Sequence, residues 1–163
     1  MAADPGKVIA ALNSILCREA QGQYASAVYV FLDETRQMGR HSAAGHPPPL
    51  LWHRATQSSV QLNASGLLLG VRSQESYPQL EFALEAGDRL LLYTDGLTEA
   101  TNPDGQEFGE FRLSDFINAH GDLSAEQFAE RLLREVLAWP GAGNSNLQSD
   151  DITVVVIDIG PKR

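Results

Sequence analysis

Residues 87–100 read Gly87-Asp-Arg-Leu-Leu-Leu-Tyr-Thr-Asp95-Gly96-Leu-Thr-Glu-Ala100. From Leu90 to Tyr93 the run is continuously apolar, as on a strand that is buried on both faces. Asp95 follows where this strand ends, and Gly96 predicts a turn there because glycine adopts positive φ at little steric cost. The stretch therefore predicts a carboxylate that is fixed at the end of a central strand and still within reach of water.

A second acidic site precedes another apolar strand. Residues 149–156 read Ser149-Asp-Asp-Ile-Thr-Val-Val-Val156, and the β-branched run predicts a buried closing strand. Carboxylates at fixed strand ends suit the hard cations Mg²⁺ and Mn²⁺, whereas softer metals require histidine or cysteine clusters. Asp95 and Asp150 are thus the candidate metal ligands, although Asp-Gly turns and acidic residues before strands also occur in purely structural loops.

Helices and short strands surround these two segments. Apolar periodicity predicts strands at 24–32, 39–44, 50–53, 59–62, 80–84, 89–93 and 152–159, and helices at 5–20, 108–119 and 124–139. The last helix opens on the capping box Ser124-Ala-Glu-Gln127. The prolines at 47–49 predict a loop because they lack the amide donor that a sheet requires. Grouped helices and antiparallel-leaning strands indicate an α+β fold.

Composition narrows the function classes. The 163 residues are 43% hydrophobic, which suffices for the core of one compact domain. The formal charge of -9 repels nucleic acid and anionic membrane surfaces. No apolar run approaches the roughly 20 residues of a membrane span. Because Cys17 is the single cysteine and no signal peptide follows Met1, we expect a cytoplasmic protein that binds neither nucleic acid nor membrane.

The ordered motifs resemble the PPM family of metal-dependent Ser/Thr protein phosphatases (type 2C-like), in its bacterial SpoIIE-like, RsbU-like branch. The matching pieces cover nearly the whole chain: Tyr24–Tyr29, Ala44–Leu50, Gly87–Ala100, Phe108–Gly109 and Ser149–Val156. The two acidic segments are specific together, whereas Ala-Gly-His-Pro alone would be weak. The resemblance implies an α-β-β-α sandwich of antiparallel sheets flanked by helices, with residues 1–163 as the C-terminal part of a single phosphatase domain.

The resemblance also implies roles for the site residues. Asp95 matches the aspartate of the family's Asp-Gly motif, and Asp150 matches the metal-binding aspartate before the last strand, so both are implied ligands of Mn²⁺ or Mg²⁺. Gly96 is implied as a backbone requirement, and Asp151 as a polar supporting residue. No catalytic side chain is expected, because water activated by two metals attacks the phosphate in this family. We interpret His46 as a loop-shaping residue outside catalysis.

One expected part of the site is missing from the sequence. Family members carry a bridging aspartate in an upstream Gly-Asp-x-x-Gly-His-Gly segment, and this sequence contains no such segment. We therefore expect Asp95 and Asp150 to bind one metal of a two-metal centre whose other ligands are absent here. Hydrolysis by this chain alone is expected to be weak or absent. A sheet without its N-terminal strands would expose open edges, so a homodimer is a further hypothesis.

Two functions remain in competition. The leading hypothesis is a phosphoserine/phosphothreonine protein phosphatase, whose substrate in this branch is implied to be a phosphorylated anti-sigma-factor antagonist in sigma-factor signalling. The alternative is a non-catalytic pseudophosphatase that binds a regulatory protein partner and does not need manganese. An unrelated α+β domain with coincidental motifs is a third hypothesis.

Overall fold

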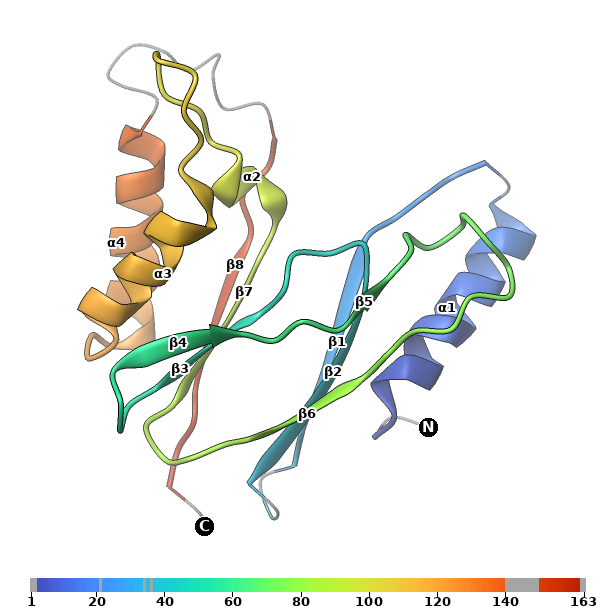
Figure 1. The fold of residues 1–163 in the computed structure, drawn as a ribbon, viewed down its shortest axis with the longest axis horizontal. Coiled ribbons are helices and arrows are strands. Elements are labelled where there is room, and N and C mark those ends of the chain that lie inside the picture. Colours follow the sequence, from blue (N-terminus) through green and yellow to red (C-terminus); the bar gives the residue numbers. More distant parts are fainter. Residues whose placement is uncertain (1–2, 21, 34, 36, 140–149, 162–163) are drawn as a thin grey trace. The chain divides into compact units, whose positions relative to one another are not determined.

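The computed structural model describes residues 3–20, 22–33, 35, 37–139 and 150–161. The chain divides into two compact units, each with its own β-sheet (Figure 1). Unit 1 comprises Met1–Pro48, Leu62–Ala86 and Pro161–Arg163, and unit 2 comprises Pro49–Gln61 and Gly87–Gly160. Both sheets are accompanied by helices, which confirms the expected α+β class.

The sheet of unit 1 is centred on one long strand. This strand, β2 (Met38–Ala44), pairs antiparallel with β1 (Ala27–Asp33) and with β6 (Leu80–Ala83). It also pairs parallel with β5 (Ser65–Gly66). The predicted hairpin is therefore present, although its first strand begins at Ala27 and not at residue 24.

One helix covers the sheet of unit 1. Helix α1 (Pro5–Glu19) begins after the predicted N-cap Asp4, whose side chain accepts a hydrogen bond from the Lys7 N–H. Its buried residue Ile9 packs with Ala44 of β2, and with Leu69 and Tyr77 from the segment between β5 and β6. Burial of this apolar helix face against the sheet is what stabilises the unit.

The sheet of unit 2 has the strand order β4-β3-β7-β8 and is antiparallel throughout. Its strands are β3 (Leu50–His53), β4 (Ser58–Gln61), β7 (Arg89–Tyr93) and β8 (Val154–Asp158). The apolar run from Leu90 onward thus forms an inner strand, as its composition predicts, and most of its side chains are buried.

The described residues of unit 2 include three helices. They are α2 (Asp95–Thr98), α3 (Gly109–His120) and α4 (Ala125–Ala138). Helix α3 lies against β3 and β4, and α4 lies against β8 (Figure 1). The capping box at Ser124 is present as predicted, with Ser124 Oγ accepting from the Gln127 N–H at 3.2 Å. The predicted helix end at Pro140-Gly141 and the loop at 141–149 lie outside the described residues.

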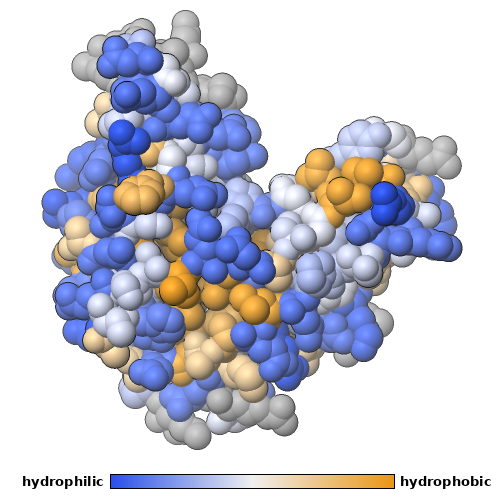
Figure 2. Space-filling model, viewed as in Figure 1, coloured by the Kyte–Doolittle hydropathy of each residue, from blue (hydrophilic) through white to orange (hydrophobic). Residues whose placement is uncertain are grey.

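Unit 1 also carries exposed apolar side chains on α1 and on the segment that follows β5, where Figure 2 shows an orange patch. These side chains are Leu12, Ile15, Leu67, Leu68 and Val71. The homodimer hypothesis stays a prediction, and a dimer interface would be expected to cover such residues. Among the described helices, none combines the length and the apolar character that crossing a bilayer would require.

Candidate metal centre

Asp95 stands at the point where β7 ends. It is the first residue of the short helix α2, and its side chain is exposed. Its Oδ1 atom accepts a hydrogen bond from the Gly96 N–H at 3.0 Å. Its carbonyl oxygen accepts from the Glu99 N–H at 2.9 Å and from the Thr98 hydroxyl at 3.1 Å. The carboxylate is therefore anchored on an ordered turn and open to solvent.

Asp150 lies at the start of the segment that leads into β8. It is exposed, and its Oδ1 atom accepts a hydrogen bond from the Asp151 N–H at 2.8 Å. Because β7 and β8 pair antiparallel with Tyr93 opposite Val154, the residues after β7 meet the residues before β8 at one edge of the sheet. The pairing of the two strands thus brings both predicted ligand segments to the same edge.

Gly96 packs directly on the backbone of the Asp150 segment. A Cβ atom at Gly96 would lie 2.7 Å from the Asp151 carbonyl oxygen and 3.1 Å from the Asp150 carbonyl oxygen. The prediction that Gly96 supplies a positive φ is wrong, because its φ is not positive and it lies within the turn of α2. The glycine is needed for space: only a residue without a side chain lets the two segments approach this closely.

Thr94 links the same two segments through its side chain, a contact that the sequence did not predict. Its hydroxyl donates to the Asp151 carbonyl at 3.0 Å and accepts from the Thr153 N–H at 2.9 Å. Its own N–H donates to the Thr153 carbonyl at 3.1 Å. Threonine is common in strands for reasons of packing, so its place before Asp-Gly was too weak a signal to assign it a role.

Asp151 supports this arrangement through its backbone. Its N–H holds the Asp150 carboxylate, and its carbonyl accepts the Thr94 hydroxyl. Its exposed side chain makes neither of these two contacts. The predicted supporting role of Asp151 therefore has a physical basis that does not depend on its carboxylate.

The donor set at this edge suits a hard divalent cation in part. Two solvent-exposed carboxylates are the kind of ligand that Mg²⁺ and Mn²⁺ prefer, and Mg²⁺ commonly keeps several waters. In the part of the chain that the structure describes, no group of three or more His, Cys, Asp or Glu side chains could hold a metal ion. The assignment of Asp95 and Asp150 as ligands of one metal stays a prediction.

The strand that leads to Asp95 ends in a buried, uncharged residue, Tyr93. Tyr93 is almost fully buried, and its hydroxyl has no hydrogen-bond partner among the described residues. Burial raises the pKa of Tyr93, and the Glu110 carboxylate adds to the shift. Tyr93 therefore stays a neutral phenol at neutral pH, and the negative charge at this edge comes from the aspartates.

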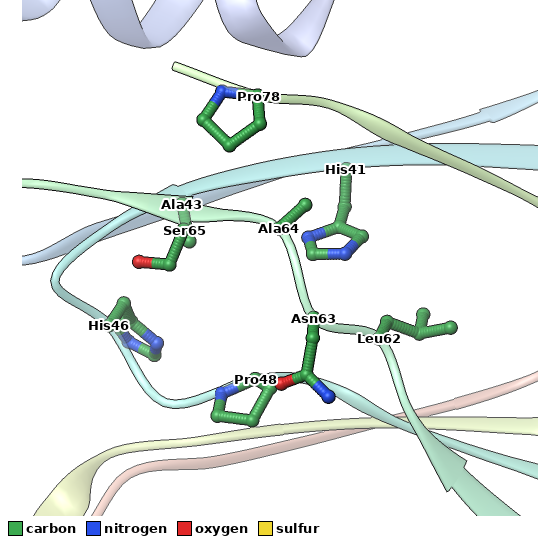
Figure 3. Close-up of a pocket in the computed structure, with 9 residues that line it drawn as sticks. All are labelled: His41, Ala43, His46, Pro48, Leu62, Asn63, Ala64, Ser65 and Pro78. Atoms are coloured by element: carbon green, nitrogen blue, oxygen red, sulfur yellow. The ribbon is translucent and has the colours of Figure 1, made fainter. Parts of the chain in front are cut away.

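His46 lines a pocket of about 390 Å³ in unit 1 (Figure 3). Its Nδ1 atom lies 3.1 Å from the Pro47 carbonyl, so this nitrogen carries the proton and the contact stiffens the loop. His41 of β2 is fully buried and also lines this pocket. Among the described residues that line this pocket are two imidazoles, those of His41 and His46.

The two nitrogens of His41 make no hydrogen bond of good geometry with the described residues. Burial lowers the pKa of His41, and a nearby Leu62 backbone group offsets only part of that shift. The ring is therefore neutral at pH 7. Sequence reasoning missed this residue, because a single histidine in a strand carries no pattern that distinguishes a buried position from an exposed one.

Comparisons with known proteins agree with one another. The model of the family SpoIIE, stage II sporulation protein E, matches residues 2–160. Phosphoserine phosphatase RsbU of Bacillus subtilis (strain 168) is 26% identical over 159 residues, which cover 94% of this chain and 44% of RsbU. The chain therefore spans less than half the length of this curated relative.

The fold is similar to solved phosphatase domains. The SiaA-PP2C domain of Pseudomonas aeruginosa matches with a TM-score of 0.82 at 21% identity, over 96% of this chain and 61% of that chain. The catalytic domain of the serine/threonine protein phosphatase PstP, solved in complex with 2 manganese ions, matches with a TM-score of 0.64 at 16% identity, over 94% and 67%. These likenesses confirm the expected fold of two sheets with flanking helices.

Proposed function

The chain belongs to the SpoIIE family of PP2C-type (PPM) phosphatase domains, in its RsbU-like bacterial branch, and on that premise we propose that it serves metal-dependent hydrolysis of phosphoserine or phosphothreonine on a protein. The family expected from the sequence motifs is confirmed. We further propose that residues 1–163, with both units, are part of a single phosphatase domain.

The observation that carries the proposal is the close approach of the two acidic segments in unit 2. The Gly96 backbone lies against the carbonyls of Asp150 and Asp151, directly beside Asp95. We propose that Asp95 and Asp150 together bind one Mn²⁺ or Mg²⁺ ion, with the remaining positions filled by water or by further ligands. Gly96 and Asp151 support them, and we assign no catalytic side chain.

The chain's own residues prepare this site in three ways. The N–H groups of Gly96 and Asp151 each hold one oxygen of the neighbouring carboxylate. The exposure of both aspartates leaves the edge open to a phosphorylated side chain. The pairing of β7 with β8 brings the two acidic segments to the same edge of the sheet. A bound cation would polarise a phosphoryl oxygen and lower the pKa of a bound water.

The substrate class follows from the branch of the family. Because the chain is RsbU-like, we propose a phosphorylated anti-sigma-factor antagonist as the substrate, in a pathway that regulates a sigma factor. The acidic character of the chain, with a formal charge of -9, would disfavour a nucleic-acid substrate.

The test is a phosphate-release assay on the full-length protein that contains this chain. With Mn²⁺ and a phosphorylated antagonist, we expect release that falls at least roughly 10-fold in Asp95→Asn, because an essential ligand is lost. The matched control is Asp115→Asn, which removes the same charge from an exposed position on α3 and should change nothing. Release that survives metal chelation, or that Asp95→Asn leaves unchanged, would refute the proposal.

A second candidate is a non-catalytic domain that binds a regulatory protein partner. It is favoured by the lack of a three-ligand group among the described residues. This function predicts a partner complex whose affinity is the same with Mn²⁺ and with a chelator, and the same in Asp95→Asn. Calorimetry with the antagonist under both conditions separates the two functions.

A further inference from the structure

The segment that carries Asp150 leaves the sheet before it reaches the site. The ladder between β7 and β8 ends at the pair Tyr93 and Val154, and residues 150–153 have no strand structure. The chain there still has to be held next to Asp95, because a carboxylate on a loose segment would bind a cation poorly. Contacts outside the ladder must therefore hold residues 150–153 in place.

The side chain of Thr94 provides two polar contacts, in addition to the hydrogen bond from the Thr94 backbone N–H to the Thr153 carbonyl. Its hydroxyl spans the Asp151 carbonyl at 3.0 Å and the Thr153 N–H at 2.9 Å, donating to the first and accepting from the second. A hydroxyl is suited to this position because it is both a donor and an acceptor. The Thr94 hydroxyl thus offers the hydrogen bonds that a paired strand would offer, at the point where the β7–β8 ladder has ended.

Thr94 is also the residue immediately before Asp95. The side chain that contacts the Asp150 segment and the Asp95 carboxylate therefore belong to adjacent residues. The Gly96 backbone contact limits how closely the segments approach, and the Thr94 hydroxyl limits how far they separate. Together these contacts limit the distance between the two backbone segments that carry Asp95 and Asp150.

We infer that Thr94 is a positioning residue for the metal centre, whose hydroxyl holds the Asp150-Asp151 segment beside Asp95. The inference rests on the proposed function, since it assigns Thr94 a role toward the cation that Asp95 and Asp150 would bind. It also makes a claim that is independent of metal: the hydroxyl, and not the shape of the side chain, orders this segment.

The test compares Thr94→Val, which keeps the shape and removes the hydroxyl, with Thr94→Ser, which keeps the hydroxyl. The matched control is Thr56→Val, which removes a hydroxyl from the β3–β4 turn of the same unit. The metal-free readout is amide hydrogen exchange at Thr153. The second readout is the Mn²⁺ concentration that half-broadens the Gly96 and Asp151 amide signals in NMR spectra.

In Thr94→Val we expect faster exchange at Thr153 and a Mn²⁺ requirement raised roughly 10-fold or more, in the range found for residues that orient ligands. Thr94→Ser and Thr56→Val should stay close to the original chain in both readouts. Unchanged exchange at Thr153 in Thr94→Val, or equal losses in the valine and serine variants, would overturn the inference.

Two further outcomes separate this inference from the proposed function. If Asp95→Asn abolishes the broadening while Thr94→Val leaves the Mn²⁺ requirement unchanged, the metal site stands and the positioning role of Thr94 is wrong. If the original chain shows no broadening at these amides, or if Asp95→Asn does not alter it, the metal site and the metal role of Thr94 are both wrong.

Discussion

At the residue scale, the candidate site depends on Gly96, which has no side chain, as much as on the carboxylates of Asp95 and Asp150. Gly96 directly follows Asp95, and the carbonyl oxygens of Asp150 and Asp151 lie against it. A methyl group there would meet two carbonyl oxygens of a neighbouring segment. Such a contact can be relieved only by movement of the backbone, because carbonyl groups cannot rotate away as a flexible side chain can.

Replacing Gly96 by alanine should therefore weaken metal binding. The added Cβ would lie 2.7 Å from the Asp151 carbonyl oxygen, so the Asp150 segment has to move away from Asp95. We expect Mn²⁺ affinity to fall by roughly 10- to 100-fold in Gly96→Ala, as for other changes that misplace ligands. Isothermal titration calorimetry measures the affinity.

The control for this prediction is Gly160→Ala in the same unit. A Cβ atom at Gly160 would meet no heavy atom within 4 Å, and its φ is not positive. The Mn²⁺ affinity of Gly160→Ala should equal that of the original chain. Equal affinities for Gly96→Ala and Gly160→Ala would show that the close approach does not matter for binding.

His41 predicts a pH dependence of stability in unit 1. Burial holds the pKa of His41 below the ordinary value of 6.5, so below that pH the unfolded chain binds a proton that the native ring does not. The free energy of unfolding should therefore fall as the pH drops through 6.5, and this loss should be absent above it. Urea unfolding at pH 7.5 and pH 5.5 measures the effect.

The variant His41→Asn removes the titrating ring and should flatten this pH dependence, whatever its effect on stability at pH 7.5. A variant with the same pH dependence as the original chain would mean that another group is responsible. The sign is fixed by burial alone, since the native state disfavours the charged imidazole.

Some residues of the candidate site could be predicted from the sequence, and others could not. Asp95 and Asp150 were predicted because each adjoins a strongly apolar strand, and strand ends hold side chains in fixed directions. Gly96 was predicted for the wrong reason, because the close approach of a distant segment cannot be seen in a local pattern. Thr94 was missed for the same cause: its partners lie more than fifty residues further along the chain.

At the scale of elements, the β7–β8 pair is held at both ends. The site lies at one end, and an ion pair lies at the other, where Arg89 faces Asp158 across the ladder. Arg89 Nε donates to Asp158 Oδ1 at 2.6 Å, and Arg89 Nη2 donates to the Leu123 carbonyl at 2.6 Å. The guanidinium also lies 4.9 Å from the centre of the Phe128 ring, so it links both strands to α4 and to the loop before it.

Removing Asp158 should destabilise unit 2. Arg89 has only 3% of its side chain exposed, so Asp158→Ala would leave a buried cation without its carboxylate partner. We expect a loss of about 2 kcal/mol in the free energy of unfolding, in the range for hydrogen bonds to charged groups. Chemical denaturation measures it, and Asp115→Ala on the exposed face of α3 is the matched control. Similar stabilities for both variants would contradict this account.

The elements that were predicted correctly are those with enough residues to show a period. Helices α1 and α4 have 15 and 14 residues, and each shows both an apolar stripe and a capped start. Strand β5 has 2 residues and helix α2 has 4, too few for any period. Both form because tertiary contacts impose them: β5 pairs with β2, and α2 is folded against the segment before β8.

At the scale of the whole molecule, the family relationship could be read from the order of short motifs, because that order is far more specific than any one of them. The division into two units could not be read in this way. Unit 2 takes residues 49–61 out of the middle of unit 1's sequence, so its sheet joins segments that are distant along the chain. Pairing between distant strands leaves no signal in either strand alone.

We propose above all that Asp95 and Asp150 bind the same cation. Crystals of this chain soaked in Mn²⁺ and measured at the manganese absorption edge test it most directly, because the anomalous signal locates the metal itself. We predict one anomalous peak at about 2.1 Å from a carboxylate oxygen of each aspartate, the distance typical of small divalent cations, and loss of that peak in Asp95→Asn. A peak that touches only one of the two aspartates, or the absence of any peak at this edge of the sheet, would contradict the claim.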